Sequence, residues 1–490
     1  MQNLHNDFIE QIREMGIDAD ALIRALDTDP SVAIRPNLQK GFAATTDADP
    51  VLWCRHASYL ASRPAFTFDP FFHSGAYYVQ DPSSMIIDRV VRHLTDDRRP
   101  VNYLDLCAAP GGKTTAAIDA LPEGSLVVAN EIDRSRAFIL RQNVIKWGAD
   151  CCVVTNDTPK RIGSLRNFFD IIAADMPCSG EGMFRKDSQA VAQWSKSLVR
   201  QCSQLSRQIV ADVWDALRPG GYFILSTCTF NRDENEEIVR LLVDDYDAEP
   251  VAIPCEHDWG IAPAIDSAAP AMRFLPHLIR GEGLFMAVVR KPGNGSRYTP
   301  KSGRSRKTSQ KVPPMCENLL VGSHILSSDG TVITALPGDR ADAMRYVADS
   351  LNAIYCGIEP ASIKGKDIIP SQALALSRYL NRNNIATVEV DYPEAISYLR
   401  GEPITVDAPK GYVLVEFEGA PLGWLKNLGN RTNNLYPKEW RIRNTHTPEQ
   451  PTRVVIGKRD EGRVAPINDT RLTNKTKGAP KLNLAHPIIL

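Results

Sequence analysis

The sequence has no apolar run approaching the roughly 20 residues that a membrane-spanning helix needs, and its N-terminus lacks the apolar core of a secretory signal peptide. Its ten cysteines are spread over 490 residues without a dense framework, which predicts free thiols in a reducing compartment rather than disulfides. No CxxC is matched by a second CxxC or by an HxxxH, so we expect no structural zinc. We therefore expect a cytoplasmic protein without membrane contact, and a monomer by default.

Neither sign of charge dominates the whole chain, whose net charge is −1. Residues 297–490 nevertheless hold 27 Lys and Arg against 19 Asp and Glu, a net charge of +8, while residues 1–296 carry −9. Between Arg297 and Lys311 there are six basic residues and no acidic one. A basic C-terminal third indicates a polyanionic partner, although an uneven but functionless surface charge would give the same pattern.

The length exceeds that of one ordinary domain, and changes in composition divide the chain into several parts. We expect an α+β module at residues 1–75, an alternating α/β domain at 76–292, a basic linker at 293–314, a small intermediate domain at 315–369, a compact β-rich domain at 370–445 and a polar tail at 446–490.

The 76–292 segment alternates short apolar runs with helical segments, which is typical of a parallel, doubly wound sheet with helices on both faces. The expected strands are Asn102–Leu106, Ser125–Asn130, Cys151–Thr155, Asp170–Ala174, Tyr222–Ser226 and Leu284–Val289. In such a sheet, ligands and chemistry gather at the carboxyl ends of the strands.

A glycine-rich turn follows the first of these strands. Its residues are Cys107, Ala108, Ala109, Pro110, Gly111, Gly112 and Lys113. Small residues there let a ligand approach the backbone, and the following helix offers unpaired N–H groups. The spacing matches neither GxGxxG nor GxxxxGK[ST], so neither a dinucleotide nor a triphosphate is indicated.

Two acidic residues follow the next two strands and complete the predicted cofactor site. Glu131 can accept hydrogen bonds from two ribose hydroxyls, and Asp157 is placed to accept from an exocyclic amine. S-adenosylmethionine is the cofactor that fits best. Taken one at a time, the glycines could simply form the turn and Glu131 could simply cap a helix.

Two further strand ends carry a thiol each, Cys178 in Asp175–Gly180 and Cys228 in Ser226–Phe230. Carbon 5 of cytosine is a poor nucleophile, so an enzyme that methylates it first adds a group across C6, and a thiolate both adds and leaves readily. Asp175 is placed to hydrogen-bond near N3 of such a ring. An enzyme that methylates an exocyclic nitrogen would favour a polar-Pro-Pro-aromatic loop, and the loop around Pro177 has no aromatic residue.

The chemistry alone leaves open which thiol is the nucleophile, because DNA cytosine-5 methyltransferases use the one in a Pro-Cys pair. The other common fate of a free cysteine is that of a small buried hydrophobic residue. We expect that fate for Cys54, Cys151, Cys152 and Cys202.

The region from Asp105 to Glu237 resembles the RNA cytosine-5 methyltransferases of the Sun/Nop (NSUN) family, especially the bacterial RsmF type that acts on 16S ribosomal RNA. The matching stretches are Cys107–Lys113, Asn130–Glu131, Asp175–Lys186 and Ser226–Glu237. The resemblance implies a Rossmann-like class I methyltransferase core that binds S-adenosylmethionine through Cys107–Lys113, Glu131, Asp157 and Asp175. It also implies that Cys228 forms the covalent adduct and that Cys178 assists release of the product. Asp157 is the weakest of these assignments, because the loop around it departs most from the family pattern.

The resemblance extends to RNA-binding elements outside the catalytic domain. Arg35 and Asn37 resemble an RNA-facing element of the family, Lys186 lies in a matching motif, and the β-rich unit resembles a PUA-type domain. The implied partner is 16S rRNA or the small ribosomal subunit. Two alternatives stay open: a tRNA substrate with the same chemistry, and a ribosome-assembly factor that binds RNA without turnover. For Arg35 and Asn37 an ordinary turn is the competing interpretation, and for the basic linker a solvated connection.

Overall fold

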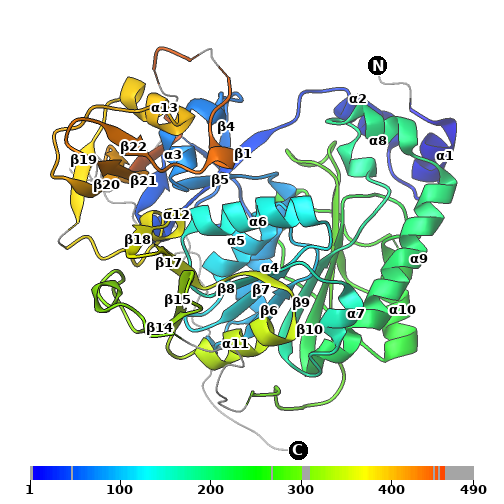
Figure 1. Cartoon of the computed structure of the whole chain (residues 1–490). Helices are drawn as coiled ribbons and strands as arrows, with labels where there is room; N and C mark the ends of the chain where they lie inside the picture. The colour runs from blue at the N-terminus through cyan, green and yellow to red at the C-terminus, as the bar shows by residue number, and fades with distance from the viewer. Residues whose placement is uncertain are drawn as a thin grey trace, which may run out of the picture.

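The computed structural model describes residues 4–45, 48–265, 269–300, 310–383, 385–444, 447–450 and 453–457. A nine-stranded sheet forms its centre (Figure 1), in the order β11-β13-β10-β9-β6-β7-β8-β16, with β12 paired to β13. The strands are β6 (Asn102–Asp105), β7 (Leu126–Asn130), β8 (Cys152–Thr155), β9 (Phe169–Asp175), β10 (Leu217–Thr227), β11 (Glu249–Val251), β12 (Ala271–Phe274), β13 (Leu284–Arg290) and β16 (Ala353–Cys356). Strands β6 to β10 run parallel, so the predicted doubly wound α/β fold is confirmed.

Helices cover both faces of this sheet and bury it in two apolar clusters. One face carries α4 (Ile86–Leu94), α5 (Gly112–Ala120) and α6 (Arg134–Trp147), and the other carries α7 (Pro159–Gly163), α9 (Lys196–Val213), α10 (Glu236–Tyr246) and α11 (Ala341–Ser350). Apolar strands buried on both faces are what a parallel sheet requires. The central strand ends are thereby fixed in position by the core.

The N-terminal module contains a second, smaller sheet with the strand order β3-β4-β1-β5. Its elements are α1 (Asn6–Glu14), α2 (Ala19–Leu26), β1 (Val32–Pro36), β2 (Phe42–Ala44), β3 (Asp49–Pro50), β4 (Ser58–Leu60), α3 (Pro70–His73) and β5 (Tyr77–Val79). Since β5 pairs with β1, this sheet continues past residue 75. Helices α1 and α2 lie apart from it, over α8 (Ser188–Gln193) in Figure 1.

Arg35 and Asn37 lie at the interface between this module and the central domain rather than at the surface. Arg35 is 3% exposed, pairs with Asp119 of α5 at 2.7 Å and lies 4.6 Å from the centroid of the Trp147 ring. The Asn37 side chain is fully buried and donates to the Trp147 carbonyl at 3.0 Å. The prediction that these two side chains face RNA is therefore wrong. Their polar groups bond across the contact between the two domains, because a polar or charged group buried without a partner would be too costly.

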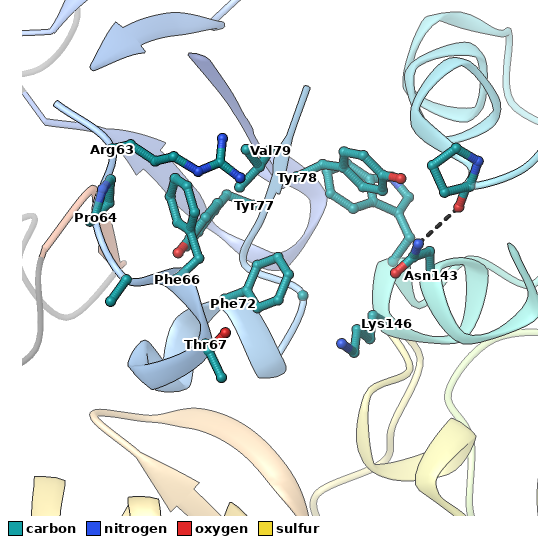
Figure 2. Close-up of a pocket in the computed structure, with 14 residues that line it drawn as sticks. Arg63, Pro64, Phe66, Thr67, Phe72, Tyr77, Tyr78, Val79, Asn143 and Lys146 are labelled. Carbon is teal, nitrogen blue, oxygen red and sulfur yellow. Dashed lines mark hydrogen bonds between the residues drawn. The ribbon is translucent and has the colours of Figure 1, made fainter. Parts of the chain in front are cut away.

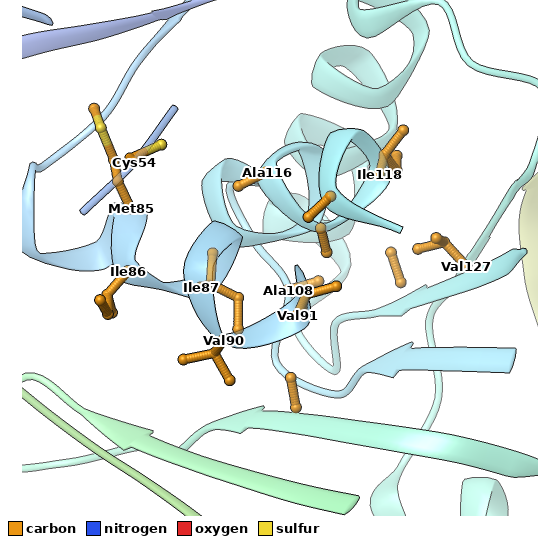
Figure 3. Packing of buried hydrophobic residues seen from close by; sticks show 14 of the residues in the cluster. Cys54, Met85, Ile86, Ile87, Val90, Val91, Ala108, Ala116, Ile118 and Val127 are labelled. Atoms are coloured by element: carbon orange, nitrogen blue, oxygen red, sulfur yellow. The ribbon is translucent and has the colours of Figure 1, made fainter. Parts of the chain in front are cut away.

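A cavity of about 520 Å³ opens between the same module and α6 (Figure 2). Figure 3 shows part of the apolar core around α4 and α5, in which Val90 and Val91 of α4 share one buried cluster with Ala116 of α5 and Ala108 of the glycine-rich turn. The turn predicted to bind a cofactor is thus supported from below by closely packed small side chains.

The predicted intermediate domain is joined to the central sheet. Its strands β14 (His324–Ser328), β15 (Val332–Pro337), β17 (Ile358–Lys364) and β18 (Asp367–Pro370) form their own sheet. Strand β16 leaves this region and pairs antiparallel with β8. An exposed edge strand invites unwanted pairing, and β16 covers the edge of β8.

The C-terminal β-rich unit holds the sheet β19-β20-β21-β22 and helix α13 (Tyr392–Arg400). The strands are β19 (Ala386–Glu389), β20 (Gly411–Phe417), β21 (Ala420–Asn427) and β22 (Thr432–Asn434). This unit shares one apolar cluster with the N-terminal module, and Phe71 packs against Phe417 at 5.5 Å between ring centroids. Strand β23 (Val455–Gly457) also pairs with β2, so the two units lie side by side in Figure 1. The limits of the domains stay a prediction.

We predict that Arg35→Met lowers the unfolding free energy by about 3 kcal/mol, because the Asp119 carboxylate loses one of its two guanidinium partners and keeps only Arg378. Urea unfolding of the full-length protein measures this. Arg99→Gln is the matched control, since Arg99 pairs with Asp97 while 84% exposed, and it should stay close to the wild type. Equal stability of both variants would contradict the interface role of Arg35.

Candidate active site

The two thiols singled out in the sequence meet in space. Asp175 ends β9 and Thr227 ends β10, and the two parallel strands pair with Ser226 opposite Asp175. Cys178 and Cys228 follow directly on adjacent loops, and their Sγ atoms are 3.2 Å apart. At this separation one thiol can donate a hydrogen bond to the other.

The loop after β9, which carries Cys178, and the loop after β10, which carries Cys228, each contribute a glutamate that binds the backbone of the other loop. Glu181, three residues after Cys178, accepts from the backbone N–H groups of Phe230 at 2.7 Å and Asn231 at 3.0 Å, on the Cys228 loop. Glu234 accepts from the backbone N–H of Ser179 at 2.8 Å and from its hydroxyl at 2.5 Å, on the Cys178 loop. Both carboxylates are fully buried. Each loop therefore fixes the backbone of the other.

Residues from the N-terminus brace this arrangement. Gln11 of α1 donates to Glu181 at 2.9 Å, and the indole N–H of Trp194 donates to the same carboxylate oxygen at 3.0 Å. The Phe8 ring packs against Phe184 at 5.1 Å and against Trp194 at 5.7 Å between centroids. Helix α1 thus closes the side of the site that lies away from the glycine-rich turn.

The hydrogen bond with Cys228, together with burial, raises the pKa of Cys178 well above that of an ordinary thiol, so Cys178 keeps its proton at neutral pH. Either sulfur can be the donor in the contact between them.

Asp175 lies between the thiols and the glycine-rich turn. Its Oδ1 accepts from the Ser226 hydroxyl at 2.7 Å, and its Oδ2 pairs with Lys113 Nζ at 2.9 Å. Burial lowers the pKa of Lys113, but the attraction and hydrogen bond of Asp175, together with the charge of Asp105, raise it on balance, so this amine stays positively charged. A carboxylate held in this way can accept a hydrogen bond from a protonated ring nitrogen placed over it.

The segment Cys107–Lys113 forms a cradle around a cavity of about 180 Å³. Gly111 has φ +114°, a conformation that L side chains rarely adopt, and a Cβ on Gly112 would lie 3.3 Å from the Gln80 side chain. Cys107, Ala108, Ala109, Pro110, Gly112, Lys113 and Asp175 all line the cavity. The sequence analysis missed Gln80, Asp81 and Ser84 on its opposite wall, which follow β5 and could have been found in the polar run after that strand.

Glu131 follows β7 and is 2% exposed. Its Oε1 accepts from the Asp133 N–H at 3.0 Å, while its Oε2 is buried, makes no hydrogen bond with the described residues and has Arg136 Nη1 as an ion-pair partner at 3.4 Å. A buried carboxylate oxygen that makes no hydrogen bond can still accept one from a hydroxyl or an amine. This observation fits a cofactor that carries ribose.

Asp157 and Lys186, two further residues predicted for the site, each have a partner within the protein. Asp157 follows β8, but its Oδ2 accepts from the backbone N–H of Asn352, and only Oδ1 is left for a ligand, 3.6 Å from Arg161 Nε. Lys186 is 30% exposed and pairs with Glu282 at 3.1 Å. Arg297, the first residue of the basic run, pairs with the carboxylate of Asp170 at 2.5 Å, and residues 301–309 of that run lie outside the described residues.

The thiol-loop carboxylates are the functional residues that sequence reasoning overlooked. Glu181 and Glu234 both lie in quoted motifs, but their burial cannot be read from a motif. The only signal was an acidic residue a few positions after each thiol. Of the four cysteines expected to be buried, Cys54, Cys152 and Cys202 are, and Cys151 is half-buried.

The described residues contain neither a cluster of metal-binding side chains nor a membrane-spanning helix. Within the described ranges, no group of His, Cys, Asp or Glu side chains is arranged to hold a metal ion. None of the helices that the structure describes has the length and apolarity needed to cross a membrane.

Comparison with protein-family models gives three separate matches along the chain. Residues 4–82 match the N-terminal domain of 16S rRNA methyltransferase RsmF, residues 93–290 match 16S rRNA methyltransferase RsmB/F, and residues 385–442 match the methyltransferase RsmF PUA domain. The three matches leave the 315–369 segment unassigned.

Similar proteins cover nearly the same extent. The chain is 30% identical over 428 residues to ribosomal RNA small subunit methyltransferase F of Salmonella agona, covering 80% of this chain and 84% of that one. It is 29% identical over 476 residues to the protein of the same name from Shewanella baltica strain OS223, covering 90% and 97%. Among solved structures, NSun6 from Pyrococcus horikoshii with SFG superposes with a TM-score of 0.51 at 16% identity, covering 60% of this chain and 100% of that one, a likeness of fold.

We predict a pH dependence of stability that comes from Glu234. Burial raises the pKa of this carboxyl to about 7 from its ordinary value of 4.5, so the folded protein retains a proton that the unfolded chain loses between these pH values. The Glu234 contribution to the unfolding free energy therefore falls as the pH rises from about 4.5 to 7, by about 3 kcal/mol in total. Urea unfolding across this range should show a shallower pH dependence for Glu234→Gln than for the wild type, and identical slopes would contradict the account.

Proposed function

Since the chain belongs to the ribosomal RNA small subunit methyltransferase F family, we propose that it methylates C5 of a cytidine in 16S rRNA, with S-adenosylmethionine as the methyl donor. Membership in the family confirms the resemblance noted in the sequence and makes the protein a methyltransferase. The proximity of Cys178 and Cys228, 3.2 Å apart beside Asp175, is the observation that carries the proposed chemistry. A protein that only bound RNA would need neither thiol.

The proposed reaction begins at Cys228. Its thiolate adds to C6 of the cytosine, the electron pair of the C5–C6 double bond moves to C4–C5, and the C4–N3 pair moves onto N3, which takes up a proton from water. Asp175 is placed to stabilise the adduct by accepting a hydrogen bond from this N3–H. C5 is now nucleophilic and takes the methyl group. C5 then loses its proton to a base, the double bond re-forms, and the bond between Cys228 Sγ and C6 breaks. We assign assistance in this last step to Cys178, whose sulfur lies next to the leaving one.

The residues around the 180 Å³ cavity fit the proposed methyl donor. When bound, S-adenosylmethionine supplies an electrophilic methyl group on a sulfonium. The backbone of Cys107–Lys113 would hold it, Glu131 would accept from its ribose hydroxyls through Oε2, and Asp157 would offer Oδ1 to the adenine amine. Lys113 and Asp175 neutralise each other at the end of the cavity nearest the thiols.

The proposed substrate is ribosomal RNA because the relatives compared above are named ribosomal RNA small subunit methyltransferase F and because the chain carries a PUA match at residues 385–442. A paired cytosine has its C5 in a base stack, so the enzyme must act on an unpaired or flipped nucleotide. We infer that it works in the cytoplasm, as a monomer, on 16S rRNA or an assembling small subunit. Lys186 is proposed to contact a phosphate near the thiols.

We predict that Cys228→Ala abolishes methyl transfer, whereas Cys178→Ala accumulates a covalent protein–RNA complex, because addition to C6 continues and release fails. Unmodified 16S rRNA is incubated with labelled S-adenosylmethionine, 5-methylcytidine is quantified in the digested RNA, and the complex is detected on a denaturing gel. Cys316→Ala is the matched control, a buried free thiol in a separate apolar cluster, and should behave like the wild type. A trapped complex with Cys228→Ala but not with Cys178→Ala would reverse the roles.

We predict that Glu131→Gln weakens binding of S-adenosylmethionine by about 10- to 100-fold, since one of two charged hydrogen bonds to the ribose hydroxyls is lost. Isothermal titration calorimetry without RNA measures this directly. Glu123→Gln, an exposed change in the turn before β7, is the control and should bind as the wild type does. Unchanged affinity of Glu131→Gln would remove Glu131 from the site.

A further inference from the structure

The cavity between the N-terminal module and α6 has a lining that the proposed reaction does not use (Figure 2). Its volume of about 520 Å³ lies within the roughly 300–1,000 Å³ typical of sites for small organic groups. One wall comes from the segment between β4 and β5, with Arg63, Phe66 and Phe72. The other wall comes from α6, with Asn143 and Lys146.

Aromatic rings dominate the interior. Phe72 and Tyr78 are half-buried and present part of their surface to the cavity, while Tyr77 and Trp147 are buried and form its floor. Phe66 and Phe72 lie 6.3 Å apart between centroids, and Tyr78 meets Trp147 at 6.4 Å. Exposed ring faces of this kind stack on nucleobases without regard to sequence.

Two cations border these rings, and no carboxylate lines the cavity. The Arg63 side chain is exposed, and its guanidinium lies 5.7 Å from the Phe66 centroid. Lys146 Nζ lies 5.0 Å from the Phe72 centroid, and among the described residues no carboxylate forms an ion pair with it. Burial lowers the pKa of Lys146 to about 8, so it keeps its charge at neutral pH. Cations without counter-charges beside aromatic rings are complementary to a phosphate next to a base.

This cavity adjoins the one beneath the glycine-rich turn. Tyr78, Val79 and Pro110 line both, so the two are separated by single side chains. Asn143 donates to the Pro110 carbonyl at 2.8 Å and so fixes this partition to α6. A strand of RNA whose target base occupies the thiol site can therefore continue over this partition.

We propose that this cavity binds an unpaired nucleotide of the substrate RNA, with its base stacked on Phe72 and Tyr78 and its phosphate between Arg63 and Lys146. This subsite rests on the proposed function, because it holds a neighbour of the methylated cytidine. It assigns to the N-terminal module an RNA contact made by residues other than Arg35 and Asn37. Stacking makes the site tolerant of base identity, and Asn143 offers an amide for a polar base edge.

Three variants test the subsite with the full-length protein, and none of them changes a residue that lines the cofactor cavity. Arg63→Gln and Lys146→Gln each remove one phosphate contact, so KM for 16S rRNA should rise about 5- to 20-fold and the slope of log KM against log salt should fall by about one. Phe72→Leu removes one stacking face but keeps an apolar side chain. It should raise KM about 10-fold without changing the salt slope. For all three we expect kcat and KM for S-adenosylmethionine to stay at wild-type values.

Arg99→Gln loses the same charge at a position before β6 and is the control, with kinetics expected to match the wild type. Photo-crosslinking supplies a second readout. A 16S rRNA transcript that contains 4-thiouridine should crosslink to the peptide bearing Phe72 or Tyr78, and Phe72→Leu should reduce that product.

The outcomes separate the two proposals. Wild-type protein that transfers no methyl group to 16S rRNA overturns the proposed function. Active wild-type protein whose three variants keep the same KM for RNA, with crosslinks only elsewhere, overturns the subsite alone. A rise in KM for S-adenosylmethionine rather than for RNA also overturns it, because the residues would then support the cofactor cavity.

Discussion

The buried carboxylates of Glu181 and Glu234, each bound to the backbone of the neighbouring loop, hold the sulfurs of Cys178 and Cys228 close together. Glu181 belongs to the Cys178 loop and accepts from the backbone of the Cys228 loop, and Glu234 makes the reverse connection. A buried N–H group that loses its acceptor costs about 1–3 kcal/mol. If either loop moved, the N–H groups of the other loop would lose the carboxylate that accepts from them. The short distance between the thiols follows from this exchange and from the parallel pairing of β9 with β10. The same exchange explains why a pair of thiols can lie side by side without a metal or a disulfide bond to hold them.

Parts of the chain far from the thiols are tied to the same framework. Asp119 of α5 accepts from Arg35 of the N-terminal module, from the indole of Trp147 and from Arg378 of the C-terminal half. Helix α1 reaches Glu181 through Gln11. The N-terminal and β-rich units also share one apolar cluster. The surfaces that could meet RNA are therefore positioned with respect to the active site by buried contacts, which is what recognition of one nucleotide within a large RNA requires.

The sequence allowed the central sheet, the glycine-rich turn and both thiols to be predicted, because each depends on local signals. Apolar runs mark buried strands, and the strand order then brings the ends with Cys178 and Cys228 to one edge. Burial of polar groups was beyond such reasoning. Arg35 and Asn37 look like surface residues in a polar turn, yet their partners Asp119 and Trp147 come from α5 and α6. The pairing of β16 with β8 could not be predicted either, since the two strands are about 200 residues apart and no local pattern in one strand specifies its partner.

The central claim is that Cys228 forms the bond to the pyrimidine, and identification of the attached peptide tests it most directly. Fluorine at C5 cannot leave as the proton does, so 16S rRNA that contains 5-fluorocytidine should remain covalently attached to the wild-type protein after methyl transfer. Protease and nuclease digestion followed by mass spectrometry would locate the attached nucleotide. The account predicts a methylated fluoropyrimidine on the peptide that contains Cys228. Attachment to Cys178, or no attachment while ordinary 16S rRNA is methylated, would contradict it.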